Sequence, residues 1–416
     1  MPGMSRNRVT VNGRSYTWPA RPLVVVCIDG SAPDYVSRAI DAGCMPFVRD
    51  MLARGADLRA DAVMPTFTNP NNVSIITGCP PSQHGICGNY YYDPATGTEV
   101  MMNDPGLLRA PTILEAFAKA GASVAAVTAK DKLRRLLGHG LEFGRHAAVS
   151  VSAEQADRTS IGEHGIEDLT GLVGMPVPEV YSADLSEFVL AAGVALMRRQ
   201  RPDIMYLSTT DYIQHGAEPG SEGANAFYAM MDRHFAGLDA LGATLVLTAD
   251  HGMSAKHSAD GSINVTYLQD ALDARFGIGP TRVILPITDP YVVHHGALGG
   301  YATVYLADGQ DRDRVMQHLG QCPGVLSVYS REDACGRFSL PPDRIGDIVV
   351  VATAEQALGT TEAAHDLSAL EGPLRSHGGL AEQEVPIYSN RPLTPPRRRL
   401  RNFDAFDLGL NAVAAG

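Results

Sequence analysis

Four stretches of this chain are continuous apolar runs rich in valine, leucine and alanine, and they end in polar or acidic residues. Such runs are typical of strands that are buried on both faces of a parallel sheet. Segments with helical spacing separate them, so strands and helices alternate along the chain. The sequence therefore predicts an α/β fold with a doubly wound, mostly parallel sheet. The runs span 23–30, 123–129, 203–211 and 244–252, and two helical segments span 111–121 and 186–200.

The character of the sequence changes after about residue 254. At 416 residues the chain is about three times a typical domain length, which leaves room for a second unit. Short strand patterns at 301–307, 324–330 and 347–353 indicate a small α+β unit, and the run at 384–389 indicates a return to the main sheet. We predict a core of residues 1–254 and 371–416, with a smaller α+β cap domain of residues 255–370 inserted into it.

The charge balance limits the choice of partners. The formal net charge is −12, which argues against nucleic acid or an anionic membrane as the main partner. A small anionic substrate is compatible with this negative net charge if metals or a few lysines make the local charge inside a cleft positive. The sequence has no signal-peptide pattern and no apolar run of about 18–20 residues, so we expect a cytoplasmic protein that does not enter the membrane.

Three aspartates come at the ends of apolar runs, namely Asp29, Asp211 and Asp250. In open parallel sheets, ligands bind beyond the carboxyl ends of the strands. Three carboxylates at one edge repel each other unless cations neutralise them. Each one alone has an ordinary explanation, because an aspartate after a strand often caps a helix.

Three histidines accompany these aspartates. His215 follows Asp211 by four residues, His251 follows Asp250 directly, and His377 stands in a Ser-His-Gly-Gly segment. A loop histidine alone is commonly a hydrogen-bonded surface group. Three aspartates and three histidines together, however, supply enough ligands for two metal sites, each with three protein ligands and an open position.

The segment 64–92 adds a candidate nucleophile. Asn69-Pro70 begins a helix-like stretch, so Thr68 is placed at a helix N-terminus, where free N–H groups favour a phosphoryl group. A threonine hydroxyl beside a divalent cation there can ionise and act as a nucleophile. The alternative is that Thr68 or Asn69 is only a capping residue.

Three further residues are candidates for substrate binding. Lys130 and Lys132 follow the run at 123–129, again at a carboxyl edge, and can pair with an anionic group. Their alternative is a charged surface loop, since Asp131 lies between them. Asn89 can donate to a phosphoryl oxygen, or it only occupies a turn.

Together these residues resemble the alkaline phosphatase superfamily, in its nucleotide pyrophosphatase/phosphodiesterase branch. The likeness covers roughly residues 20–255 and 371–410, and its motifs occur in the family's order. Within the branch, the Thr-Ala-Lys-Asp-Lys segment and the Asn-Pro-Asn-Asn start most resemble the phosphonoacetate hydrolases. The motifs are TNPNN at 68–72, TG at 77–78, HGI at 84–86, DG at 29–30, DxxxH at 211–215, DHGM at 250–253 and SHGG at 376–379.

The resemblance implies an alkaline-phosphatase-like core that holds two zinc ions per subunit. It assigns one ion to Asp211, His215 and His377, and the other to Asp29, Asp250 and His251 with Thr68 as fourth ligand. It assigns substrate binding to Thr68, Asn89, Lys130, Lys132 and His215. Three imidazoles favour zinc, whereas the carboxylates leave manganese or iron open.

The implied activity is hydrolysis of the C–P bond of phosphonoacetate to acetate and phosphate, through a phosphothreonine at Thr68. The alternative is a metal-dependent phosphodiesterase or phosphomonoesterase, and a phosphodiesterase needs an apolar slot for its leaving group rather than paired lysines. A non-catalytic metal- or phosphate-binding module would lack an activated nucleophile, which Thr68 argues against. The size and the class of enzyme suggest a homodimer.

Overall fold

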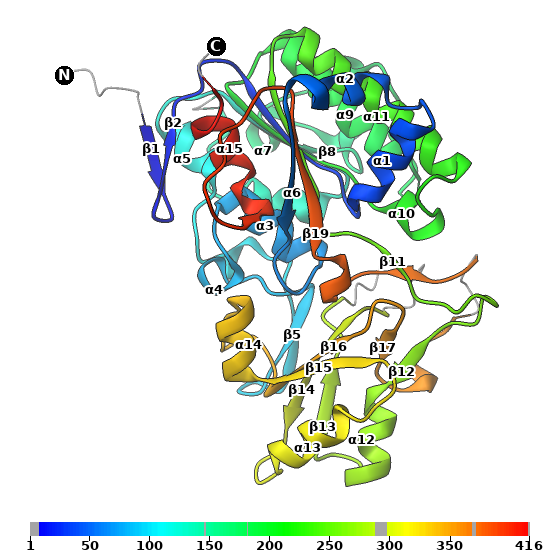
Figure 1. The fold of residues 1–416 in the computed structure, drawn as a ribbon. Coiled ribbons are helices and arrows are strands. Elements are labelled where there is room, and N and C mark those ends of the chain that lie inside the picture. Colours follow the sequence, from blue (N-terminus) through cyan, green and yellow to red (C-terminus); the bar gives the residue numbers. More distant parts are fainter. Residues whose placement is uncertain (1–7, 145–146, 181, 288–297, 368–371, 415–416) are drawn as a thin grey trace.

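An eight-stranded sheet forms the centre of the larger part of the molecule (Figure 1). The computed structural model describes residues 8–144, 147–180, 182–287, 298–367 and 372–414. Only β19 (Glu384–Ser389) runs antiparallel to both neighbours, so the sheet is mostly parallel, as predicted. Its order is β20 (Leu400–Arg401), β4 (Ala56–Asp61), β19 (Glu384–Ser389), β10 (Thr244–Thr248), β3 (Leu23–Cys27), β9 (Ile204–Ser208), β7 (Val124–Thr128) and β8 (Ala148–Ser152).

Helices cover both faces of this sheet, which makes the fold doubly wound. Successive side chains of a strand point to opposite faces, and in β3 Val24 and Val26 enter one core while Val25 and Cys27 enter the other. The helices of the first face are α1 (Pro33–Asp41), α2 (Pro46–Arg54), α9 (Asp184–Arg199) and α11 (Glu222–Ala240); those of the second include α3 (Thr68–Thr77), α5 (Ile113–Lys119) and α15 (Ala405–Asn411).

The register of the three central strands brings their carboxyl ends to one edge. Cys27 at the end of β3 pairs with Thr248 of β10 on one side and with Ser208 of β9 on the other, and all three strands are parallel. The residues that follow these ends therefore leave the sheet together. Asp29 is two residues beyond β3, Asp250 two beyond β10 and Asp211 three beyond β9.

A second, four-stranded antiparallel sheet lies below the first in Figure 1, inside the predicted cap region. The hairpin β5 (Tyr90–Asp93) and β6 (Thr98–Met101), which we assigned to the core, contacts this sheet through the ring pair Tyr92–Tyr305 and the ion pair Arg282–Glu99. The strands of this second sheet are β13 (Thr281–Ile284), β14 (Tyr301–Leu306), β16 (Ile348–Ala352) and β15 (Val325–Ser330). The helices of the same region include α12 (Leu268–Phe276), α13 (Arg312–Leu319) and α14 (Arg331–Phe338).

Residues 33–54 form two helices rather than one, because Gly43 adopts a left-handed φ of 75° and Pro46 starts a new helix. The edge-side strand β4 has the polar sequence ADLRAD and carries no strand pattern. In the residues that the structure describes, no helix is both long enough and apolar enough to cross a membrane, and all six cysteines are free thiols.

Candidate active site

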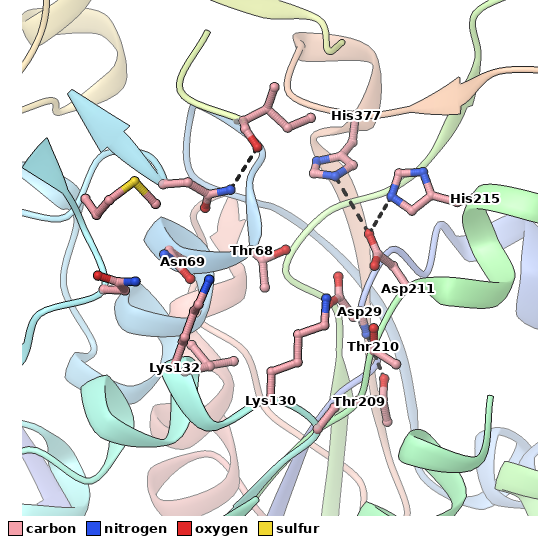
Figure 2. Close-up of a pocket in the computed structure, with 16 residues that line it drawn as sticks. Asp29, Thr68, Asn69, Lys130, Lys132, Thr209, Thr210, Asp211, His215 and His377 are labelled. Carbon is pink, nitrogen blue, oxygen red and sulfur yellow. Dashed lines mark hydrogen bonds and ion pairs between the residues drawn. The ribbon is translucent and has the colours of Figure 1, made fainter. Parts of the chain in front are cut away.

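The carboxyl edge of the main sheet opens into a cavity of about 90 Å³ (Figure 2). Eight of the predicted site residues line it, and the other two, Asp250 and His251, are fully buried. The eight are Asp29, Thr68, Asn89, Lys130, Lys132, Asp211, His215 and His377.

Asp29, Asp250 and His251 form one cluster, called here the sheet-end group. Their ligand atoms lie within 4.8 Å of one another, and His251 Nε2 is 3.3 Å from Asp29 Oδ1 and 3.8 Å from Asp250 Oδ2. All three residues lie two or three positions beyond the ends of the neighbouring parallel strands β3 and β10, so the sheet itself sets their spacing.

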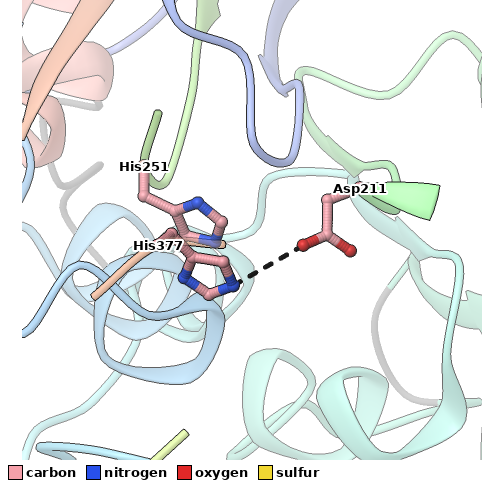
Figure 3. Close-up of side chains that lie close together, drawn as sticks. All are labelled: Asp211, His251 and His377. Carbon is pink, nitrogen blue, oxygen red and sulfur yellow. Dashed lines mark ion pairs between the residues drawn. The ribbon is translucent and has the colours of Figure 1, made fainter. Parts of the chain in front are cut away.

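Asp211, His215 and His377 form the second cluster, called here the loop group. Asp211 Oδ2 is 2.9 Å from His215 Nε2 and 3.7 Å from His377 Nε2. Asp211 precedes α10 (Tyr212–Gly216) and His215 lies one turn into it, so the i, i+4 spacing places them on one face. The His377 ring stacks on that of His251 at 3.7 Å between centroids (Figure 3), and Asp211, His251 and His377 also bring ligand atoms within 4.8 Å of one another.

In all three imidazoles Nδ1 faces the backbone and Nε2 faces an aspartate. Nδ1 of His215, His251 and His377 lies 2.8, 2.9 and 2.7 Å from a backbone carbonyl oxygen, of Arg375, Gly252 and Thr66 respectively. A carbonyl oxygen only accepts, so each Nδ1 carries the proton and donates it. A neutral ring then presents the Nε2 lone pair, which is the form that binds a metal ion.

The electrostatics of the cluster call for positive charge. Burial, and then the neighbouring carboxylates of Asp211 and Asp250, raise the pKa of Asp29 well above its ordinary value. Burial acts in the same direction on Asp211, but His215, and less strongly His377, hold its pKa well below the ordinary value. Burial and His251 lower the pKa of His377. The buried aspartates thus lie close together without enough positive charge beside them to offset their own.

One buried oxygen shows how well a cation would fit. Asp29 Oδ1 accepts no hydrogen bond from the residues that the structure describes, although it is buried and faces His251 Nε2. An unpaired buried carboxylate oxygen is costly. Asp29 Oδ1 and His251 Nε2 face each other at 3.3 Å with a lone pair on each atom. A cation between them would bind both lone pairs, so these residues fit a divalent ion.

Thr68 stands at the edge of the sheet-end group. It is the first residue of α3, and its Oγ1 lies 3.4 Å from His251 Nε2. The preceding residues are held by Asn71, whose side chain bonds the backbone of Val63, Pro65 and Phe67. The hydroxyl is therefore fixed where the free N–H groups of the first helical turn favour an anion.

The two lysines come from the other wall of the cavity. Lys130 immediately precedes α6 (Asp131–Leu137) and Lys132 is its second residue. In Figure 2 Lys130 points toward Asp29, and Lys132 ends nearer Asn69 and Thr68. The charge of Lys130 acts on Asp29 to lower its pKa, against the larger effect of burial. Asn89 also lines the cavity, and its Nδ2 donates to the Ile287 carbonyl at 3.0 Å, so it links the β5 hairpin to the inserted region.

Sequence reasoning missed several residues that support the ligands. Asn72 donates to Asp250 Oδ2, and the Thr209 hydroxyl accepts from the Asp29 N–H at 3.0 Å. The Thr66 hydroxyl bonds the Gly378 N–H and the Gly379 carbonyl, both at 2.9 Å. Lys256 and Glu382 form a fully buried ion pair at 2.8 Å. For Thr209 a signal existed, since it lies between β9 and Asp211, and Asn72 belongs to the TNPNN motif, although no role was assigned to it. Thr66, Lys256 and Glu382 carried no signal.

The comparison with known proteins assigns the chain to one family. Residues 23–379 match the type I phosphodiesterase/nucleotide pyrophosphatase family, and the chain belongs to it. Short stretches match curated relatives: 36% identity over 84 residues of an ectonucleotide pyrophosphatase/phosphodiesterase of Caenorhabditis elegans, and 31% over 93 residues of a pyrophosphatase/phosphodiesterase of Schizosaccharomyces pombe. These matches span only 10% and 18% of those proteins' own lengths.

Solved structures narrow the likeness. Phosphonoacetate hydrolase from Sinorhizobium meliloti 1021, in crystal structures with phosphonoacetate and with phosphonoformate, is 60% identical over 99% of this chain and 100% of that one, with a TM-score of 0.96. Human ectonucleotide pyrophosphatase/phosphodiesterase 5 shares the fold, at 18% identity over 95% of this chain and 96% of that one and a TM-score of 0.64. These comparisons confirm the predicted α/β fold and the predicted likeness to phosphonoacetate hydrolases. They also confirm the prediction of a hydrolase of the alkaline phosphatase superfamily.

Proposed function

We propose that this chain hydrolyses the C–P bond of phosphonoacetate, giving acetate and phosphate. The observation that carries the proposal is that one small cavity is lined by Thr68, two lysines, Asp29 of the sheet-end group and all three members of the loop group. The 60% identity to a phosphonoacetate hydrolase supports the same substrate.

The size and charge of the cavity suit this substrate. Pockets for drug-sized ligands occupy about 300–1,000 Å³, whereas this one holds about 90 Å³. Phosphonoacetate carries a phosphonate and a carboxylate on one carbon, so it is small and highly anionic. Lys130 and Lys132 neutralise these oxygens and favour a ligand with two anionic groups.

We infer that the metal ions are two zinc ions. The sheet-end group with Thr68 holds one, and Asp211, His215 and His377 hold the other. Divalent ions in these places supply charge that lowers the pKa of a bound hydroxyl or water and offsets charge on substrate oxygens. Metal analysis of the purified protein tests this, with two zinc ions per chain expected and manganese or iron contradicting it.

The chain's own residues then perform two displacements. Thr68 gives its hydroxyl proton to solvent water and its Oγ1 attacks phosphorus, so that a P–O bond forms as the C–P bond breaks. The electron pair of the broken bond moves onto the acetate carbon, where the adjacent carboxylate delocalises it until water supplies a proton. A water molecule next breaks the bond between phosphorus and Thr68 Oγ1, which releases phosphate and returns the hydroxyl proton. The first turn of α3 and Asn89 face the phosphoryl oxygens, while the lysines hold the substrate in line.

The inserted region acts, in this proposal, as a cap on the cavity. Ile287 belongs to it and lines the cavity, and the carbonyl of Pro286 accepts from the Asn89 N–H at 2.7 Å. The cap and the β5 hairpin therefore approach the substrate together. The division into a core of 1–254 and 371–416 and a cap of 255–370 is part of the same proposal.

Cleavage of a phosphate ester is the second candidate, because the matched family is named for phosphodiesterases. The test measures phosphate release from phosphonoacetate, p-nitrophenyl phosphate and a phosphodiester, each with and without a chelator. We expect phosphonoacetate to be turned over best, chelator to stop the reaction and added zinc to restore it. Faster turnover of either ester would favour the second candidate instead.

A further inference from the structure

Asn72 joins the proposed nucleophile to the sheet-end group. It lies four residues after Thr68 in α3 and is fully buried. Side chains on a helix tilt toward its N-terminus, so this residue reaches back over the first turn. Its Nδ2 donates to the Thr68 carbonyl at 3.1 Å and to Asp250 Oδ2 at 3.0 Å.

The amide of Asn72 uses its full hydrogen-bonding capacity. Its Oδ1 accepts from the Tyr206 hydroxyl at 2.7 Å and from the Ser208 hydroxyl at 2.8 Å, both on β9. An amide side chain offers two N–H donors and two oxygen lone pairs, so all four are engaged. The orientation is unambiguous, because the Thr68 carbonyl and the Asp250 carboxylate only accept.

Asp250 is in turn held by donors from three segments. Its Oδ1 accepts from the Gly30 N–H at 3.2 Å and the His251 N–H at 3.0 Å, while Asn72 binds Oδ2. The two backbone donors fix one oxygen only. Asn72 supplies the bond that fixes the plane of the carboxylate and, through the Thr68 carbonyl, its position relative to α3.

We propose that Asn72 is a positioning residue of this enzyme, which orients Asp250 toward a cation and fixes Thr68 relative to it. The consequence for turnover rests on the proposed function, whereas the consequence for metal binding does not. Partners that orient metal ligands are commonly worth 10–100-fold in metal affinity. The effect falls on the sheet-end group, because neither Asp211 nor His377 is bonded to Asn72.

The main variant is Asn72→Leu, combined with Tyr206→Phe and Ser208→Ala. The last two changes remove the hydroxyls that would otherwise be buried without an acceptor, so the fold keeps most of its stability. In a chelator titration of the zinc-loaded protein, we expect the affinity for one of the two ions to be about 10–100-fold lower than in the wild type. We also expect kcat on phosphonoacetate to fall while KM changes little.

Asn390 provides the matched control. It is also a buried asparagine, and its side chain bonds Asp239, Ala243 and Leu245 rather than a ligand of either group or a residue beside Thr68. Asn390→Ser should lower the unfolding temperature and leave the affinity for both ions at the wild-type level.

Two results would overturn the proposal. One is wild-type affinity for both ions in the triple variant. The other is an equal weakening of both ions in the triple variant and in Asn390→Ser, which would mean a general loss of structure. If the wild-type protein released no phosphate from phosphonoacetate, the proposed function would fail, and the chelator titration would still decide the role of Asn72.

Discussion

The sheet-end group and the loop group are held by different parts of the molecule. Asp29 and Asp250 stand at the ends of adjacent strands whose ladder runs without interruption from Leu23 to Cys27. His377 lies in a segment that returns to the core after the inserted region, and it is tied down by Thr66 and by Gly300, whose N–H donates to the His377 carbonyl at 2.8 Å.

A buried ion pair strengthens this tie. Glu382 Oε2 accepts from the Gly379 N–H at 2.9 Å, and its Oε1 pairs with Lys256, which also donates to the Ala354 carbonyl of the inserted region at 2.8 Å. The loop group therefore depends on contacts between segments far apart in sequence, including the inserted region. We expect changes outside the site to weaken the loop group before they affect the sheet-end group.

The largest effect belongs to Thr68, on the side of the sheet-end group. In Thr68→Ala, turnover of phosphonoacetate should fall by at least about 10³-fold because the nucleophile is gone. Both metal ions should stay bound, since each group keeps three protein ligands. Phosphate release and metal content check this, with Thr77→Ala as the control, a buried helix threonine whose hydroxyl bonds Val73. Turnover that survives Thr68→Ala would rule out the phosphothreonine.

Lys256→Met tests the dependence of the loop group on its ion pair. The change leaves Glu382 buried and unpaired, which should cost about 3–5 kcal/mol of the free energy of unfolding. The ion of the loop group should be released more readily, while that of the sheet-end group keeps its affinity. Denaturant unfolding and chelator titration measure the two effects.

A second variant separates charge from structure at this pair. Lys256→Met with Glu382→Gln removes both charges but keeps an acceptor for the Gly379 N–H, so most of the stability should return. If the double variant is as unstable as the single one, the unpaired charge is not the cause. If both variants lose the two ions together, the two groups are not independently held.

The difference between the groups also explains what the sequence could predict. Asp29, Asp211 and Asp250 follow apolar runs, so their convergence follows from strand topology alone. His377 lies 126 residues after His251, beyond the inserted region, and only the likeness to a family placed it. Asn72 lies in the TNPNN motif, but its bond to Asp250 could not be predicted, and neither could the Lys256–Glu382 pair, because these partners are set by tertiary packing.

The lysines oppose the loop group across the cavity and should affect substrate rather than metal. Lys130→Met or Lys132→Met removes a charged hydrogen-bond donor worth about 1.5–3 kcal/mol, so kcat/KM for phosphonoacetate should fall about 10–100-fold. Lys119→Met is the control, since this exposed lysine pairs with Glu115 on α5. Steady-state kinetics measure the change, and loss of a metal ion in either lysine variant would contradict the assignment to substrate.

The smallest expected effects come from the same threonine-to-valine substitution made once beside each group. Thr209→Val removes a hydroxyl that accepts from the Asp29 N–H, and Thr66→Val removes one that bonds both Gly378 and Gly379. Each lost hydrogen bond is worth about 1 kcal/mol. The β3 ladder holds Asp29 in any case, so Thr209→Val should leave zinc affinity within about twofold of wild type. The loop of His377 has no such ladder, and Gly378 adopts a φ of 117° there. Thr66→Val should therefore weaken one ion about tenfold, and equal effects of the two variants would show that strand ends and loop hold their ligands equally well.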